Sequence, residues 1–181
     1  HLTTRNACNA VLGEIPGAVM TDDGSLLNKD TGNWAPYRPA VGSDREAIAM
    51  LRSVLALRRG AGRDFLTLGR MLRPATVDGA DPVVWENQAR VHRLPALFDA
   101  AWRAPDGRAA VVLANWTDRD RRVSLKDDRL GRRLRIHSSG RRLDEMARNR
   151  RCDSATVDVK VPALGCVLVE GIDPRLEEGD S

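Results

Sequence analysis

A run of six apolar residues at 109–114 constrains this fold more than any other feature. It reads "AAVVLA" and is followed at once by the polar stretch "NWTDRDR". A short apolar run bounded by turn residues is typical of a strand that is covered on both faces. We therefore predict a central strand here, a polar turn over 115–121, and a return strand that begins over 122–125.

Similar short segments separated by turn signals fill the region from 63 to 172. "APDG" at 104–107 has the composition of a tight turn, and residues 157–161 alternate valine with aspartate and lysine. Alternation of this kind gives a strand one buried face and one wet face. The pattern predicts a mainly β fold, an antiparallel β-sandwich over 63–172, with 173–181 as a disordered tail. The run "FLTLGRMLRP" is expected to be extended and to open the sandwich.

We expect one contiguous hydrophobic core in this sandwich. Its predicted members are Leu66, Leu72, Val112, Leu113, Val123, Leu134, Val159, Val167 and Val169.

Residues 43–59 predict one amphipathic helix before the sandwich. "SDRE" at 43–46 is a capping box, apolar residues recur at three- and four-residue steps, and Gly60 and Gly62 end the pattern. Residues 1–42 are predicted to be irregular, with a strand end and a turn in "ACNAVLGEIPG". Because the sandwich follows so closely, we expect part of the apolar stripe to be exposed and residues 1 to about 60 to be loosely held.

The charge is unevenly distributed along the chain. Residues 119–151 contain thirteen basic and five acidic residues, a local charge of +8, whereas the whole chain carries +4. A basic segment attracts phosphates. This one has acidic interruptions and no aromatic residue for stacking on bases. We interpret it as solvated strand faces, and nucleic-acid or anion binding is the least favoured alternative.

"NWT" at 115–117 has the form of a glycosylation acceptor. A three-residue motif often occurs by accident. We predict instead that Asn115 caps the strand end through its side chain and that Trp116 packs on the sheet.

The cysteines and histidines are too scattered for a structural zinc site. Cys8, Cys152 and Cys166 form no framework, and the chain has only three histidines, His1, His92 and His137. Cys166 is predicted to be a small buried residue, while a Cys152–Cys166 bridge stays open. No metal and no cofactor are expected.

Several carboxylates are candidate catalytic acids, because glycoside hydrolysis uses two carboxyl groups about 5–10 Å apart. Glu14 follows an apolar run, where a (β/α)₈ barrel carries catalytic acids, and Asp22, Asp23 and Asp30 follow. No spacing along the chain establishes such a distance. We interpret all four as solvated acids and predict no catalytic residue in this chain.

The order of these parts resembles the C-terminal end of large glycoside-hydrolase-like proteins. In those, a (β/α)₈ barrel is followed by a small antiparallel β-sandwich. The segment "REAIAMLRSVLALRR" resembles the last barrel helix, "FLTLGRMLRP" the linking strand, "AWRAPDGRAAVVLANWTDRDRRVSL" the hairpin, and "VPALGCVLVE" the closing strands. The resemblance implies that 1–62 is the end of a barrel and that the sandwich has a structural role. It also implies a parent in carbohydrate metabolism that meets carbohydrate through its barrel.

A different class of function is a non-catalytic carbohydrate-binding sandwich. Such modules present exposed aromatic rings to sugars, and the candidates are Trp85, Trp102 and Trp116. Their positions within strand-like runs favour core packing instead. No apolar run is long enough to span a bilayer, so we expect no membrane partner.

Overall fold

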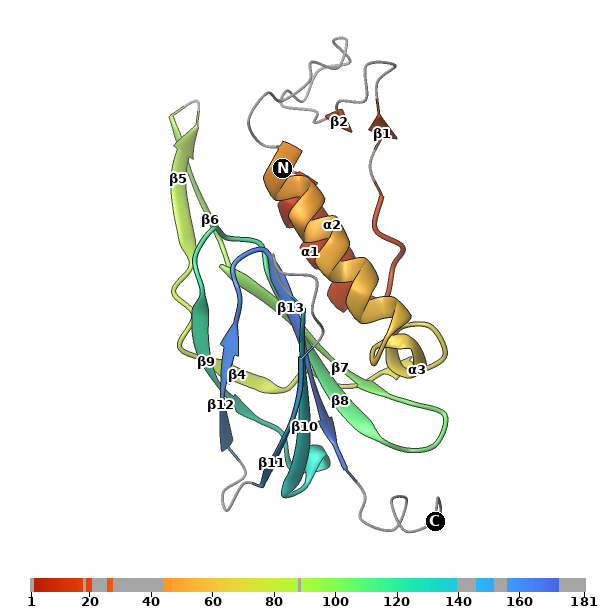
Figure 1. Cartoon of the computed structure of the whole chain (residues 1–181). Coiled ribbons are helices and arrows are strands. Elements are labelled where there is room, and N and C mark those ends of the chain that lie inside the picture. The colour runs from red at the N-terminus through yellow and green to blue at the C-terminus, as the bar shows by residue number, and fades with distance from the viewer. Residues whose placement is uncertain are drawn as a thin grey trace.

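The computed structural model describes residues 2–17, 19–20, 26–27, 44–87, 89–139, 146–151 and 156–172. The predicted mainly β, antiparallel fold is confirmed. Three layers are stacked: a pair of helices, a six-stranded sheet and a three-stranded sheet (Figure 1).

The six-stranded sheet is the middle layer, and its strand order is β11-β10-β13-β8-β7-β3. Its strands are β3 (Arg70–Met71), β7 (Leu97–Arg103), β8 (Ala109–Asn115), β10 (Arg133–Ser139), β11 (Met146–Arg151) and β13 (Gly165–Gly171). Every residue of β8 and β13 is buried. The predicted central strand is therefore confirmed, and the turn at 104–107 joins it to β7 through a hydrogen bond from the amide of Gly107 to the carbonyl of Ala104.

The three-stranded sheet covers one face of the middle layer. Its order is β12-β9-β4, with β4 (Thr76–Asp78), β9 (Arg121–Lys126) and β12 (Thr156–Val161). The predicted alternation in β12 is confirmed, since its three valines are buried and the residues between them are exposed. The remaining strands form two separate pairs, β1 (Val19–Met20) with β2 (Leu26–Leu27), and β5 (Val83–Asn87) with β6 (Arg90–Leu94).

The predicted return strand is present as β9, but it does not lie beside β8. β8 pairs with β7 and β13, whereas β9 pairs with β12 and β4 in the other sheet. Both edges of β8 are thus already hydrogen-bonded, so the chain crosses over after Asn115. On the far side, Val123 and Leu125 reach the core between the sheets.

The helical layer contains more than the sequence pattern predicted. Besides α2 (Asp44–Arg59), the structure has α1 (Leu2–Val11) and a short α3 (Arg63–Leu66). Residues 2–11 are therefore helical rather than irregular, and the run that begins at Phe65 starts in a helix rather than a strand. Thr and Asn are weak helix formers, so α1 depends on tertiary packing of its Ala7, Ala10 and Val11 stripe.

The expected exposure of part of the α2 stripe is confirmed only in part. Ile48 is 37% exposed and Leu51 and Leu55 are half-buried, whereas the rest of the stripe is covered. Its buried residues are Ala47, Met50, Val54 and Leu57. Of these, Met50, Val54 and Leu57 pack on the outer face of the six-stranded sheet, beside α1. A buried serine adds a polar link, because the Ser53 hydroxyl donates to the carbonyl of Ser139 (2.7 Å) and accepts from the amide of Cys166 (3.1 Å).

Two hydrophobic clusters replace the single predicted core. Leu66 and Val112 lie in the cluster between the helices and the middle sheet. Leu113, Val123, Leu134, Val159, Val167 and Val169 are buried between the two sheets, where Leu72 packs against them. Successive residues of a strand point to opposite faces, so the apolar run 109–114 of β8 contributes to both clusters.

The residues before and after position 62 share the helix-side cluster. The division of the chain into 1–62 and 63–172 stays a prediction. The predicted tail at 173–181 and the capping residue Ser43 lie outside the described residues.

We predict that Val112→Asp unfolds the protein. Val112 has no exposed surface and faces the helices, and burying an unpaired carboxylate costs several kcal/mol. Val84→Asp is the matched control, because Val84 is 55% exposed on the hairpin. Thermal unfolding followed by circular dichroism compares them. A soluble Val112→Asp protein that melts cooperatively near the wild-type temperature would contradict the three-layer arrangement.

We predict that amides 47–57 of α2 are about as protected from hydrogen exchange as amides 109–113 of β8. Both segments are buried against the same cluster, and protection follows burial within one cooperative unit. The exposed hairpin from Val83 to Leu94 should exchange faster. Mass spectrometry of exchanged peptides measures all three, and rapid exchange of α2 alone would show that the helix is not docked.

Candidate functional site

A deeply buried charged group of the described chain is Glu170 on β13, whose side chain is 5% exposed. It lies beneath the helices on the face of the middle sheet that also carries Ala110, its partner across β8. His137 Nε2 is 2.9 Å from one carboxylate oxygen and Arg108 binds the other at 2.7 Å. Since an ionised carboxylate only accepts hydrogen bonds, His137 donates through Nε2.

Arg108 connects this carboxylate to the short helix and to the turn at 104–107. Its guanidinium also binds Asp64 at 2.9 Å and Asp106 at 2.7 Å, and it lies 5.2 Å from the ring centre of Phe65. Three carboxylates thus use the donors of one guanidinium. This charged cluster ties α3, the β7–β8 turn and β13 together, and we assign it a structural role.

The surroundings of Glu170 lower its pKa. Burial acts in the opposite direction, but the hydrogen bond from His137 and the positive charges of His137, Arg108 and Arg135 outweigh it. Arg135 lies 3.7 Å from the carboxylate. Glu170 is therefore held ionised, which suits an ion pair rather than a general acid.

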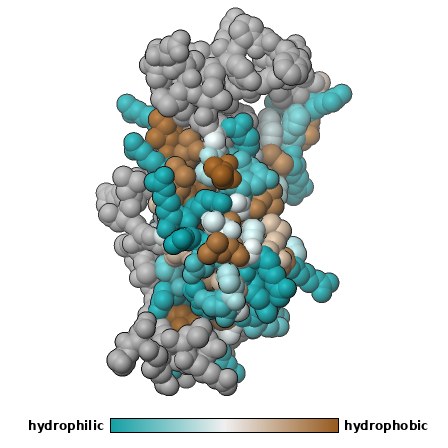
Figure 2. Space-filling view, turned by 90° about the vertical axis from the view of Figure 1, so that its right-hand side faces the viewer, coloured by the Kyte–Doolittle hydropathy of each residue, from teal (hydrophilic) through white to brown (hydrophobic). Residues whose placement is uncertain are grey.

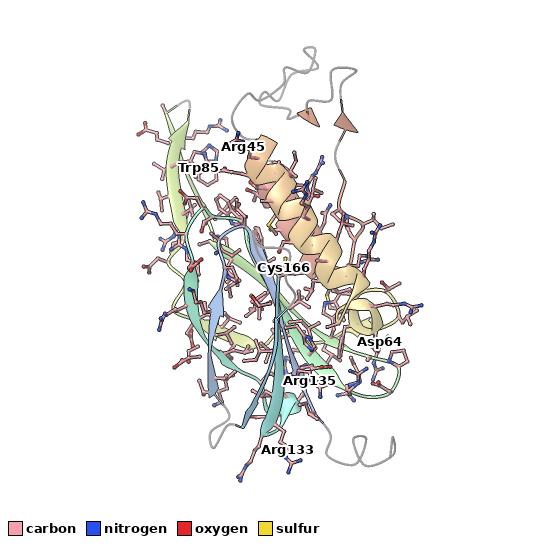
Figure 3. All side chains as sticks on the ribbon, in the orientation of Figure 1. Arg45, Asp64, Trp85, Arg133, Arg135 and Cys166 are labelled. Atoms are coloured by element: carbon pink, nitrogen blue, oxygen red, sulfur yellow. The ribbon has the colours of Figure 1, made fainter. Side chains whose placement is uncertain are left out.

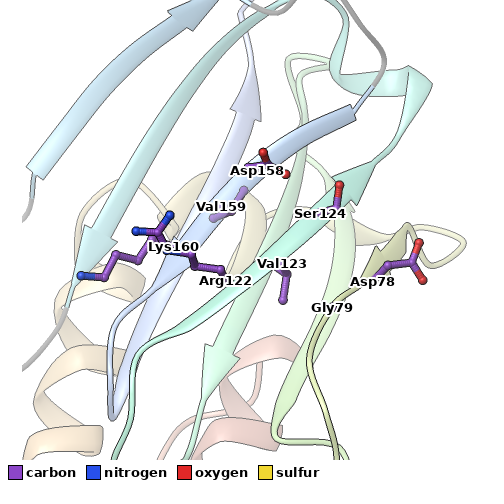
Figure 4. Close-up of a pocket in the computed structure, with 8 residues that line it drawn as sticks. All are labelled: Asp78, Gly79, Arg122, Val123, Ser124, Asp158, Val159 and Lys160. Carbon is purple, nitrogen blue, oxygen red and sulfur yellow. The ribbon is translucent and has the colours of Figure 1, made fainter.

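A hollow of about 660 Å³, lined by both apolar and charged residues, lies on the solvent side of the three-stranded sheet (Figure 4). Asp78 on β4 and Asp158 on β12 both stand opposite Ser124 on β9. Both aspartates are exposed. Lys160 turns away from them and pairs with Asp120 at 2.7 Å. An exposed carboxyl lacks the desolvation with which enzymes keep a general acid protonated, so this hollow offers little to catalysis.

A second hollow, of about 360 Å³, lies where the two long helices begin, and we call it the helix-end recess. Its lining residues are Thr3 from α1, Glu46 from α2, Val83 from β5, and Trp116, Thr117, Asp118, Arg119 and Arg121 from the β8–β9 connection and the start of β9. Segments far apart in sequence therefore meet here, and they bring an indole ring, two carboxylates and two guanidinium groups to one place.

Asn115 organises the connection that forms the floor of this recess. It is fully buried, and its amide nitrogen donates to the carbonyls of Arg119 (2.7 Å) and Pro162 (3.0 Å). Its side-chain oxygen accepts from the backbone amide and the hydroxyl of Thr117, at 3.0 and 2.8 Å. The structure therefore confirms the predicted cap. In the folded chain this amide nitrogen is occupied and inaccessible as a glycosylation acceptor.

The three candidate tryptophans have different environments. Trp102 is buried in the helix-side cluster and donates to the carbonyl of Val11 at 2.9 Å. Trp116 is half-buried against the same cluster, donates to the carbonyl of Pro95 at 2.7 Å and lines the helix-end recess. Trp85 is half-buried on the hairpin and stacks on His92 with 5.2 Å between ring centres. Core packing is thus confirmed for Trp102 and in part for Trp116.

Glu14 follows a helix, not a strand, so the expected likeness to the end of a barrel strand is wrong. It is exposed after α1 ends. Asp22, Asp23 and Asp30 lie outside the described residues. The sequence pattern missed Asp99 on β7, whose pKa is raised by burial. It stands opposite Leu113 in the sheet, and an isolated acid in an apolar strand gives no sequence signal.

Cys166 is a free thiol with no exposed surface, so the Cys152–Cys166 bridge left open above is wrong. Burial raises the pKa of this thiol to about 12, which makes it unreactive. Cys152 itself and His1 lie outside the described residues. Within the described part of the chain, no three His, Cys, Asp or Glu side chains gather closely enough to hold a metal ion.

Several arginines of the basic segment are paired within the protein. Arg129 binds Asp127, Arg135 reaches Glu170, and Arg121 donates to the Thr117 hydroxyl. Figure 3 shows Arg133 and Arg135 near one end of β10, far from Trp85. No helix in the described part is long and apolar enough to cross a membrane.

Exposed hydrophobic side chains are scattered over the surface. They are Leu12, Ile15, Ile48, Leu68, Met71, Val84 and Val91. The face in Figure 2 shows hydrophobic areas interrupted by hydrophilic side chains. Isolated exposed apolar residues are common in soluble proteins, so we assign this face no binding site.

We predict that Glu170→Gln lowers the free energy of unfolding at about pH 7 by roughly 1.5–3 kcal/mol, as the loss of charged hydrogen bonds does. A carboxyl whose pKa is lowered by folding stabilises the native state at neutral pH. That stability disappears as the pH falls through the folded-state pKa. The difference from wild type should therefore shrink below about pH 4.

Urea unfolding at several pH values measures this difference. Asp120→Asn is the control, since the Asp120–Lys160 pair is exposed and should contribute little. A Glu170→Gln penalty that is unchanged at low pH would show that charge is not the cause.

No protein-family model matches the chain, and no curated protein sequence matches it. Parts of three solved structures are similar to parts of it. CelM2, a bifunctional glucanase-xylanase from a metagenome library, is 10% identical over 45% of this chain and 17% of its own, with a TM-score of 0.39. A GH51 arabinofuranosidase from Xanthomonas axonopodis pv. citri is 16% identical over 66% of this chain and 25% of its own, with a TM-score of 0.43.

A GH30 endoxylanase from Clostridium papyrosolvens is 11% identical over 54% of this chain and 24% of its own, with a TM-score of 0.37. The chain therefore aligns with at most a quarter of the length of each of the three proteins. At TM-scores this low, none of these likenesses establishes a shared fold.

Proposed function

We propose that this chain is the C-terminal part of a glycoside-hydrolase-like protein and that its β-sandwich has a structural, accessory role beside a catalytic barrel. The support comes from the order of sequence parts described above and from the charged cluster around Glu170. The buried carboxylate of Glu170 is used to hold elements of the fold together. A carboxylate used in this way supports a structural role for the sandwich.

The surface acids among the described residues do not offer an alternative active centre. Asp78 and Asp158 in the outer hollow are exposed, and so are Glu46 and Asp118 in the helix-end recess. Asp99 has a raised pKa, but the strand pairing places Leu113 opposite it rather than a second acid. Glycoside hydrolysis needs an acid and a second carboxylate that face one bond. We therefore assign no catalytic residue within the part of the chain that the structure describes.

The test compares this 181-residue chain with the natural protein isolated from its source. We expect the natural protein to be longer, to contain repeated βα units before the region described here, and to hydrolyse aryl glycosides. The chain alone should show no turnover. Mass spectrometry gives the length and release of nitrophenol gives the activity.

Two results would overturn this proposal. One is a natural protein with the mass of this chain. The other is turnover of aryl glycosides by the chain alone that Glu14→Gln abolishes, which would make Glu14 catalytic.

A further inference from the structure

The helix-end recess has the composition of a small-molecule site. Its volume of about 360 Å³ is near the lower end of the range for such sites, about 300–1,000 Å³. Val83 and Trp116 give it an apolar side, while Glu46, Asp118 and Arg119 give it exposed hydrogen-bonding groups. Sites of this kind combine an apolar surface with a few placed polar groups.

The charges around the recess disfavour a charged ligand. An anion would meet the carboxylates of Glu46 and Asp118, whereas a cation would meet the guanidinium groups of Arg119 and Arg121. A neutral ligand with several hydroxyl groups uses both kinds, because its hydroxyls donate to carboxylates and accept from guanidinium groups.

The floor of the recess is fixed before any ligand arrives. Thr117 is buried, its hydroxyl donates to Asn115 at 2.8 Å, and it accepts from the Arg121 guanidinium at 3.3 Å. Its carbonyl accepts from the amide of Leu164 at 3.0 Å. A connection held in this way loses little conformational entropy on binding.

The apolar side of the recess continues along the hairpin. Val83 and Trp85 lie two residues apart on β5 and share one face, and His92 stands opposite Trp85. In Figure 3, Trp85 on the hairpin and Arg45 at the start of α2 lie toward the same end of the molecule. On the other side, the indole of Trp116 is held by its bond to Pro95. Rigid aromatic faces suit the C–H faces of sugar rings.

We propose that the helix-end recess binds the ring of a neutral saccharide without cleaving it, with Trp116 as the apolar contact and Asp118 and Glu46 as hydrogen-bond acceptors. This function is additional to the structural role of the sandwich. It depends only on the geometry of this chain and holds whether or not a barrel precedes it.

Nuclear magnetic resonance of the isotopically labelled chain tests this proposal. Xylotetraose and cellotetraose are the neutral probes, with tetragalacturonate and inorganic phosphate as anions and tetraglucosamine as the cation. We expect a neutral probe to bind with a dissociation constant on the order of 1 mM. The largest chemical-shift changes should occur at the Trp116 indole N–H and at the backbone amides of residues 116–121. No shifts with either neutral probe, or stronger binding of a charged probe, would overturn the proposal.

Asp118→Ala separates this site from any other. Asp118 is exposed and outside both clusters, so the variant should fold, and it should bind the neutral probe about tenfold more weakly. Asp78→Ala, on the exposed side of the other sheet, is the matched control and should bind like wild type. Equal affinity of Asp118→Ala and wild type would place the ligand elsewhere and refute the assignment.

Discussion

The architecture depends on covering both faces of the central strand pair, β8 and β13. Every residue of the two strands is buried, so neither face tolerates water, and each needs its own apolar layer. The three-stranded sheet provides one layer and the pair α1 and α2 provides the other. This requirement explains why both helices are integral to the fold: α1 packs on β8, which carries Val112, and α2 packs on β13, which carries Leu168.

Polar groups at the ends of the central strands fix how the layers join. At one end Asn115 satisfies its amide with carbonyls of the β8–β9 connection and of the segment after β12. At the other end the carboxylate of Glu170 pairs with Arg108 and accepts a hydrogen bond from His137. Buried polar groups need partners, so these two residues restrict the directions in which the chain leaves the sheet. The helix-end recess is one consequence, because its floor is the connection that Asn115 holds.

The sequence predicted an element correctly where the residue pattern is compatible with one kind of secondary structure. Alternation in β12, the uninterrupted apolar run of β8 and the spacing in α2 each predicted the observed element. The sequence analysis missed α1, because short helices with weak intrinsic propensity form only through packing. The polar residues Thr3, Thr4 and Asn6 also make the apolar stripe of α1 hard to recognise in the sequence. The sequence also did not show which sheet β9 joins, since an alternating strand pairs equally well in either sheet.

The sequence by itself determined the class of the fold, the position of the buried strand pair and the capping role of Asn115, because periodicity and turn chemistry are local. Only the tertiary structure decided that two cores exist, that α1 and α2 share one of them, and that Trp102 is buried while Trp116 lines a recess. Those outcomes depend on which distant segments meet, such as Thr3, Glu46 and Val83 around one hollow. Contacts between distant segments are set by competition for the same apolar surfaces, which no local pattern records.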